Sequence, residues 1–224
     1  MKLKMCISSV IAALLLIQFA VGCGQGSPSS TSSSSNPTAT AGSLSTFDFH
    51  AEKEGTTPPD AIIFSGQWQV QKEAGAPSPP NALCQVGSAT YPAVQLGSIV
   101  YTDLMASVGF KPISGKSDQA AGIIFRIQDK NNFYILRANA LENNVNLYKF
   151  SNGDRSTIKE SSVPVKTGEW QTLRVEVKGT RIRGFLNDQM VLEADDSSFS
   201  AGYVGLWTKS DSVSCFDDFK ITSS

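Results

Sequence analysis

From residue 45 to residue 224, apolar and polar side chains alternate with a period of two residues, which is the spacing of a β-strand. In "WQTLRVEVK", residues 170–178, the apolar side chains are Leu173, Val175 and Val177, with polar or charged residues between them. Such runs are short, and Gly, Asn, Asp, Ser and Pro separate them. Eleven or more strands with short connections predict an all-β fold, an antiparallel sandwich of two sheets.

The first 44 residues have a different composition. Lys2 and Lys4 precede an apolar run at 7–20, which is shorter than the ~20 residues of a membrane-spanning helix. The run ends in "AVGC", residues 20–23, which resembles the lipobox of bacterial lipoproteins. We therefore expect a lipoprotein-type signal peptide at residues 1–22 and lipidation of Cys23. Ordinary signal cleavage at the same small residues is the alternative.

Residues 23–44 consist mainly of Ser, Thr, Gly and Pro, so they lack the apolar surface of a core and are expected to form a flexible tether. The remaining residues, 45–224, suit a single domain with a sizeable core. This arrangement predicts an exported domain that a lipid anchor holds in the bacterial cell envelope. The sequence does not identify the membrane leaflet.

The charge balance argues against a nucleic-acid partner. The whole chain has 19 basic and 20 acidic residues, and loss of Lys2 and Lys4 with the signal leaves a net charge of about −3. No basic patch of the nucleic-acid-binding type is present, and His50 is the one histidine.

The stretch "AGIIFRIQDKNNFYILRANA", residues 121–140, reads as two strands joined by a polar loop at 129–132. The predicted core face carries Ile123, Phe125, Ile127, Tyr134 and Leu136. The opposite face carries Ile124, Arg126, Gln128, Phe133, Ile135 and Arg137. Because guanidinium groups are not buried unpaired in a core, this mixed face is predicted to look outward and to suit a polyhydroxylated or acidic ligand. The alternative is a solvated face whose arginines pair with carboxylates such as Glu176.

The same alternation sets three further aromatic residues opposite core positions. Tyr148 follows Leu147, while Tyr203 and Trp207 flank a stretch whose inward residues are Val204 and Leu206. These rings are predicted to contact the ligand together with the outward face of the hairpin. The alternative is that they cover a sheet edge or lie beneath a loop.

Four stretches carry a family resemblance: "FRIQDKNNFYILR" (125–137), "WQTLRVEVKGTRIRGFL" (170–186), "GYVGL" (202–206) and "CFDDF" (215–219). Together they resemble the concanavalin A-like jelly-roll superfamily, in particular laminin-G-like, glycoside-hydrolase-16-like and 3-keto-disaccharide hydrolase (domain of unknown function 1080) domains. The resemblance covers nearly all of residues 45–224 and implies a jelly-roll sandwich. It indicates the fold better than the activity, because the superfamily includes sugar binders, glycosidases and adhesion modules.

The sequence assigns no catalytic residue. Family-16 enzymes carry E-x-D-x-x-E on one strand, so that alternation directs all three carboxylates at the substrate. The nearest match has Glu193 and Asp195 but Ser198 in place of the second glutamate. No G-x-S-x-G motif accompanies His50. Whether the chain is an enzyme therefore stays open, with the balance against it.

A metal site and a disulfide are suggested near the end of the chain. Alternation in "VSCFDDFKI" puts Asp217 in an apolar stripe, and a buried carboxylate needs hydrogen bonds or a cation. The resemblance implies a structural calcium where the first and last strands meet, with Asp48 and Asp217 as ligands; the alternative is a bulge that turns one carboxylate outward. Cys84 and Cys215 lie in an early and a late strand, which sandwiches of this type often bring together. A disulfide is expected, and two separate cysteines are the alternative.

The leading functional prediction is thus a lipid-anchored, extracytoplasmic domain that binds carbohydrate. Two alternatives remain from the resemblance. One is a glycoside-acting hydrolase of the 3-keto-disaccharide hydrolase kind, and the other is a laminin-G-like module that binds an envelope protein.

Overall fold

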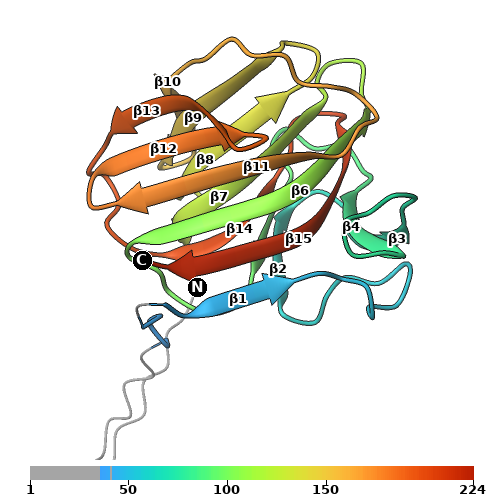
Figure 1. Cartoon of the computed structure of the whole chain (residues 1–224), viewed down its shortest axis with the longest axis horizontal. Helices are drawn as coiled ribbons and strands as arrows, with labels where there is room; N and C mark the ends of the chain where they lie inside the picture. Colours follow the sequence, from blue (N-terminus) through green and yellow to red (C-terminus); the bar gives the residue numbers. More distant parts are fainter. Residues whose placement is uncertain (1–35, 41) are drawn as a thin grey trace, which may run out of the picture. The chain divides into compact units, whose positions relative to one another are not determined.

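The computed structural model describes residues 36–40 and 42–224. The predicted signal peptide, the predicted lipidation site Cys23 and part of the predicted tether lie outside the described residues. Two antiparallel β-sheets pack face to face (Figure 1), which confirms the predicted all-β sandwich. In the described part of the chain, no helix is long and apolar enough to cross a membrane.

The first sheet has eight strands in the order β13–β12–β11–β6–β15–β4–β3, and β1 pairs with β15. Its strands are β1 (Leu44–Phe47), β3 (Trp68–Lys72), β4 (Asn81–Gln85), β6 (Leu104–Ser114), β11 (Gln171–Lys178), β12 (Arg181–Leu186), β13 (Gln189–Asp195) and β15 (Val213–Ser223).

The second sheet has seven strands in the order β10–β9–β8–β7–β14–β5–β2. Its strands are β2 (Ala61–Ser65), β5 (Ala93–Leu96), β7 (Ala120–Asp129), β8 (Asn132–Asn139), β9 (Asn144–Ser151), β10 (Asp154–Lys159) and β14 (Tyr203–Trp207).

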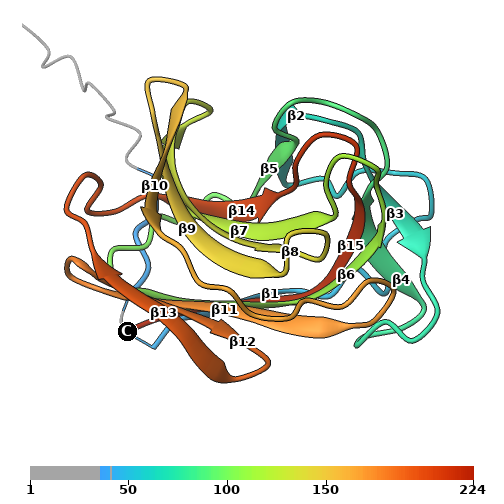
Figure 2. The same ribbon diagram turned by 90° about the horizontal axis from the view of Figure 1, so that it is seen from above.

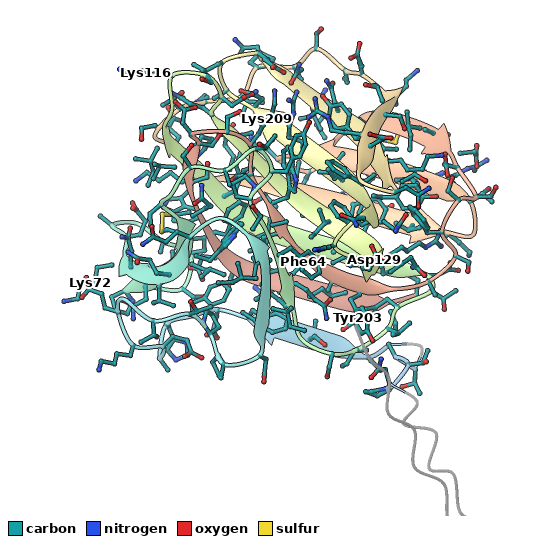
Figure 3. The ribbon with its side chains drawn as sticks, turned by 180° about the vertical axis from the view of Figure 1, so that it is seen from behind. Phe64, Lys72, Lys116, Asp129, Tyr203 and Lys209 are labelled. Atoms are coloured by element: carbon teal, nitrogen blue, oxygen red, sulfur yellow. A yellow bond between two sulfur atoms is a disulfide. The ribbon has the colours of Figure 1, made fainter. Side chains whose placement is uncertain are left out.

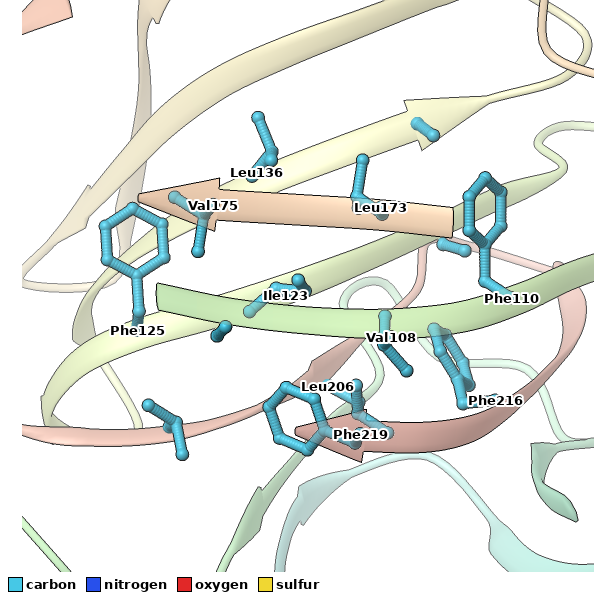
Figure 4. Close-up of a cluster of buried hydrophobic side chains, with 14 of the residues drawn as sticks. Val108, Phe110, Ile123, Phe125, Leu136, Leu173, Val175, Leu206, Phe216 and Phe219 are labelled. Carbon is cyan, nitrogen blue, oxygen red and sulfur yellow. The ribbon is translucent and has the colours of Figure 1, made fainter. Parts of the chain in front are cut away.

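The hydrophobic core lies between the two sheets. Leu173, Val175 and Val177 of β11 are all buried in it, as the alternation predicts. Figure 4 shows phenylalanine rings among the side chains of this cluster, including Phe110 and Phe216. Burial of an aliphatic or aromatic side chain contributes roughly 1.5–3 kcal/mol, so the core determines which face of each strand points inward.

Three short strands were missed by sequence reasoning, and all of them belong to the seven-stranded sheet. They are β2, β5 and β10, of five, four and six residues. In β10, "DRSTIK", Ile158 is the one aliphatic side chain, so no apolar alternation marks the strand. Because two of the missed strands, β10 and β2, form the two edges of the sheet, the number of its strands could not be predicted.

The predicted pairing of β7 with β8 is wrong in register. Asp129 pairs with Asn132, so the connecting turn has two residues instead of the four expected. Ile124 pairs with Ile135, whereas the expected four-residue loop would place it opposite Arg137. The register shifts between Phe125 and Asp129, which is the signature of a β-bulge.

The bulge changes the direction of two neighbouring side chains, Arg126 and Ile127. Arg126 has a left-handed backbone with φ of 49°. Its side chain turns to the end of the sandwich, whereas Ile127, which was predicted to be in the core, joins a second apolar cluster on the outer side of the sheet. The expectation that Arg126 lies on the outward face is therefore wrong, because strict alternation does not continue through a bulge.

Two glycines of the neighbouring strand segment allow close backbone packing. A Cβ on Gly202 would lie 2.4 Å from the carbonyl carbon of Arg126, and one on Gly205 would lie 2.1 Å from the carbonyl oxygen of Val94. Any side chain at either position would collide with backbone. The bulge at Arg126 thus requires glycine opposite it.

The guanidinium of Arg126 connects segments from both sheets. Its Nε donates to the carbonyl oxygen of Thr102 at 3.1 Å, and its Nη1 donates to that of Phe199 at 2.9 Å. Its Nη2 donates at 2.9 Å to the carbonyl oxygen of Gly179, in the turn between β11 and β12. These bonds satisfy backbone acceptors at the end of the sandwich.

A second polar contact lies close to Phe199. The hydroxyl of Tyr134 donates to Asp196 at 2.6 Å, and the backbone N–H of Phe199 donates to the same hydroxyl at 3.1 Å. Burial opposes ionisation of Asp196, but hydrogen bonds from Ser198, Tyr134 and Lys149 outweigh it and lower the pKa of Asp196 to about 2. The loop after β13 is therefore fastened by an ionised carboxylate.

The expected disulfide is confirmed. Cys84 and Cys215 are direct cross-strand partners on β4 and β15 and form the bond. Both are buried, and Trp170 packs against the small cluster around them. The bond joins positions separated by 131 residues in sequence.

Replacement of both cysteines, Cys84→Ala with Cys215→Ala, is expected to lower the free energy of unfolding by up to ~4–5 kcal/mol, because the link restricts the unfolded chain. Urea denaturation of both proteins measures the difference. A reducing agent should lower the stability of the wild type towards that of the variant and leave the variant unchanged. Equal stability of the two proteins without reductant would contradict the prediction.

Candidate functional site

The outer surface of the seven-stranded sheet, which we call the open face, carries a second apolar cluster. In Figure 2 this sheet curves, and its two edges rise on the side away from the eight-stranded sheet. Figure 3 looks onto the open face, with Lys209 towards one end and Tyr203 and Asp129 towards the other. The cluster consists of Ala93, Ala120, Ile124, Ile127, Phe133, Ile135, Tyr148, Phe150 and Trp207, with Phe64, Tyr91 and Tyr203 packed against it.

The rings of the open face contact one another in a connected array. Phe133 stacks on Phe150 with centroids 4.9 Å apart, and Tyr91 meets Phe150 edge-on at 5.0 Å. Tyr91 also stacks over Trp207 at 6.0 Å. Trp207 is 0% exposed, whereas Tyr91, on the connection between β4 and β5, is half-buried. Within this array of four rings, Tyr91 is thus the one that a ligand can reach, and Trp207 supports it.

A hollow of about 570 Å³ opens beside these rings. Its aromatic lining comes from Phe64, Tyr91, Phe133 and Phe150. Lys130 and Asn131, in the turn between β7 and β8, contribute polar groups. An aromatic floor with a few polar groups beside it is the common composition of a small-molecule binding site.

Arg137 lies on the open face as predicted, but it is 1% exposed. Its Nη2 donates to Glu142 at 2.5 Å and to Asn144 at 2.7 Å, and its guanidinium lies 5.2 Å from the ring centre of Tyr148. Burial alone would raise the pKa of Glu142, but the charge of Arg137 and the hydrogen bonds of Asn144 and Arg137 lower it. Glu142 is therefore ionised at neutral pH.

A second ion pair lies towards the Lys209 end of the sheet. Lys209 approaches the nearly buried Asp118 at 3.2 Å, and the side-chain amide of Asn139 donates to the same carboxylate at 2.9 Å. Each of the two carboxylates in this part of the face thus has a cationic partner.

Arg155 of β10 lies on the open face between two rings. Its guanidinium is 4.6 Å from the ring centre of Tyr148 and 5.5 Å from that of Tyr91. Sequence reasoning missed it because β10 was not recognised. Tyr91 was missed because it lies in a connection, where alternation does not show which way a side chain points. An aromatic residue among turn residues was the one feature of the sequence that could have indicated it.

The predicted ligand-binding residues divide into two groups. Five of them share the open face: Phe133, Arg137, Tyr148, Tyr203 and Trp207. Arg126 and Gln128 do not join them. Arg126 binds carbonyl oxygens at the end of the sandwich, and the amide of Gln128, past the bulge, donates to the carbonyl oxygens of Arg126 and Ala201.

A larger hollow, of about 740 Å³, lies on the eight-stranded sheet near the turn between β11 and β12. No aromatic ring lines it, and its lining includes Glu176, Lys178, Arg183 and Asp195. Two of these are already paired, since Arg183 bonds to Glu193 at 2.6 Å and Glu176 contacts Arg174. The open face is the better candidate because aromatic rings line its hollow.

The candidate calcium ligands do not share a cluster of metal ligands. Asp217 accepts backbone N–H bonds from Ser78 at 2.6 Å and from Asp218 at 2.8 Å, while Asp48 contacts the ring of His50 at 2.6 Å. Among the described residues, no three His, Cys, Asp or Glu side chains group closely enough to hold a metal ion. Burial nevertheless raises the pKa of Asp217 to about 6, against the lowering effect of the two backbone bonds. Calcium binding stays a prediction.

The fold and its open face define the chain as a two-sheet β-sandwich of the galectin and concanavalin A type. Residues 39–222 match the 3-keto-alpha-glucoside-1,2-lyase-like domain family, and the chain belongs to that family.

One relative and two solved structures are similar to parts of this chain. The levanase of Bacillus subtilis (strain 168) is 34% identical over 93 residues, which are 41% of this chain and 14% of levanase. The carbohydrate binding module CBM66 from Bacillus subtilis is 24% identical, with a TM-score of 0.64 over 73% of this chain and 96% of the module. A Bacillus subtilis protein of unknown function with a galectin-like fold is 12% identical, with a TM-score of 0.54 over 73% of this chain and 89% of that one.

The stability of the domain is expected to depend on pH through Asp217. Because burial raises the pKa of Asp217 in the folded state, its contribution is complete below the unfolded pKa of about 4 and is lost as pH rises through about 6. Urea denaturation between pH 4 and pH 8 should show a fall in wild-type stability that Asp217→Asn lacks.

The same variant tests the calcium prediction. A calcium ion on Asp217 would favour the charged carboxylate, so calcium should raise the melting temperature of the wild type at neutral pH and not that of Asp217→Asn. Magnesium is the control for ionic strength. If calcium stabilises both proteins equally or neither, Asp217 is not a ligand.

Proposed function

We propose that this chain is an exported carbohydrate-binding domain whose open face holds the sugar. The observation that carries the proposal is the hollow lined by Phe64, Tyr91, Phe133 and Phe150, with the guanidinium of Arg155 beside its rings. Sugar rings present C–H faces that pack on aromatic rings, and their hydroxyl groups bond to side-chain donors and acceptors at the rim.

The relatives support binding as the function. A carbohydrate-binding module shares the fold over nearly its whole length, and the segment related to levanase is a small part of that enzyme. A segment that makes up a small part of a polysaccharide-degrading enzyme is better explained as a module that binds the substrate than as the domain that cleaves it. Levan is therefore the first polysaccharide to test.

Export and anchoring complete the proposal. The buried disulfide between Cys84 and Cys215 supports folding in an oxidising compartment outside the cytoplasm. A lipid on Cys23 would hold the domain at a membrane, with residues 23–44 as the spacer. Loss of the protein from the membrane fraction in Cys23→Ser would support the anchor, and retention there would count against it.

Membership of the 3-keto-alpha-glucoside-1,2-lyase-like family favours a second candidate, an enzyme that acts on 3-keto-glucosides. Glu142 and Asp118 are the carboxylates of the open face that such a reaction would use. Turnover of a 3-keto-glucoside by the purified protein, lost in Glu142→Gln or Asp118→Asn, would establish it. If the 3-keto-glucoside binds but is not converted, the enzyme candidate fails and the binding function stands.

Tyr91→Ala is expected to weaken binding of the sugar about tenfold, because it removes an accessible ring beside the hollow. Calorimetric titration of the full chain with levan and a panel of neutral and acidic polysaccharides measures the effect. Met190→Ala is the control, since Met190 is 53% exposed on the other sheet. The proposal fails if no polysaccharide binds, or if binding is the same in Tyr91→Ala and the wild type.

A further inference from the structure

Arg155 differs from the other buried and half-buried arginines of the described residues. Its guanidinium makes no hydrogen bond and no ion pair with any described protein group, and its Nη1 is shielded from solvent without a partner. Each of the others donates to at least one protein oxygen: Arg126, Arg137, Arg174 and Arg183. A guanidinium carries five N–H donors, so Arg155 holds unused donor capacity.

Two rings keep this guanidinium in place. Tyr148 and Tyr91 lie 4.6 and 5.5 Å from it, from β9 and from the connection between β4 and β5. Contacts to ring faces orient the side chain without occupying its in-plane N–H groups. The two rings thus hold in place a long side chain whose ordering would otherwise weaken binding.

The positive charge of Arg155 is also uncompensated among the described residues. The positive charges of Arg137 and Lys209 are matched by Glu142 and Asp118. No carboxylate lies within ion-pair distance of Arg155 among the described residues. The ligand group that fits beside Arg155 therefore carries one negative charge and accepts hydrogen bonds without donating any.

We propose that Arg155 receives the carboxylate of an acidic sugar, so that the ligand of the open face contains uronic acid. A carboxylate accepts two parallel bonds from a guanidinium, whereas a neutral hydroxyl leaves its charge unpaired. The sugar ring then packs beside Tyr91 over the hollow. This inference rests on the proposed function and specifies the class of carbohydrate.

The direct test compares acids with their own esters. Oligomers of galacturonate, glucuronate and mannuronate, and the methyl ester of each, are titrated into the full chain by calorimetry. The backbone and its C–H faces are the same within each pair, and only the carboxylate differs. At least one acid should bind about tenfold or more tightly than its ester, which is the size expected for a charge-assisted hydrogen bond. That preference should weaken as salt is added.

Three variants identify the residue responsible. Arg155→Gln should abolish the preference for the acid, and Arg155→Lys should keep part of it, because the charge remains and the two-pronged geometry is lost. Arg181→Gln is the matched control, since Arg181 is an exposed arginine on the other sheet. Melting temperatures check that each variant is folded. The comparison of acid with ester in the wild type remains a test of the inference even if a variant fails to fold.

The outcomes separate the two proposals. If neutral polysaccharides bind and no acid is preferred over its ester, the inference fails and the carbohydrate-binding function stands. A preference for the acid that survives in Arg155→Gln also overturns the inference. If neither neutral nor acidic sugars bind, both proposals fail together.

Discussion

The contact between the Arg126 guanidinium and three backbone carbonyls is the constraint on which the end of the sandwich depends. Thr102, Gly179 and Phe199 come from three separate connections, and one planar cation satisfies an acceptor from each. Burial lowers the pKa of Arg126, yet the group stays charged because the pKa of a free guanidinium is far above neutral. Without Arg126, these oxygens would lose their shared partner, which costs roughly 1–3 kcal/mol for each one left unsatisfied.

The same residue sets the composition of the open face. Its left-handed backbone moves Ile127 to the outer side of the sheet, opposite Tyr203 of β14. Gly202 makes room for the bulge, and the register of β14 shifts beside it. One residue in an uncommon conformation thus removes a cation from the open face and adds an aliphatic side chain to it. The face is more apolar at its Tyr203 end than alternation alone would make it.

Sequence reasoning succeeded where strands are regular and failed where they are not. The inward positions of Val204 and Leu206, and the outward ones of Tyr203 and Trp207, follow from a period of two. A bulge changes the period by one residue, and nothing in "IFRIQ" distinguishes Arg126 from a residue that continues the strand.

Two residues of the candidate site could not be found for other reasons. Tyr91 lies in a connection, where the position of a side chain depends on the packing of distant strands. Arg155 lies in a strand that is stabilised by its pairing with β9 and carries little apolar surface of its own. Trp207 was correctly placed on the open face, but its exposure depends on Tyr91, 116 positions earlier in the sequence.

The protonation state of the carboxylates on the open face affects whether this surface can catalyse a reaction or only bind a ligand. A general acid needs a pKa near or above the working pH, which in proteins comes from burial or from a nearby negative charge. At Glu142, burial is outweighed by the charge of Arg137 and the hydrogen bonds of Asn144 and Arg137, which keep its pKa low. A carboxylate that stays ionised can accept hydrogen bonds from a sugar but supplies no proton to a leaving group, so the electrostatics around Glu142 favour binding over acid-assisted cleavage.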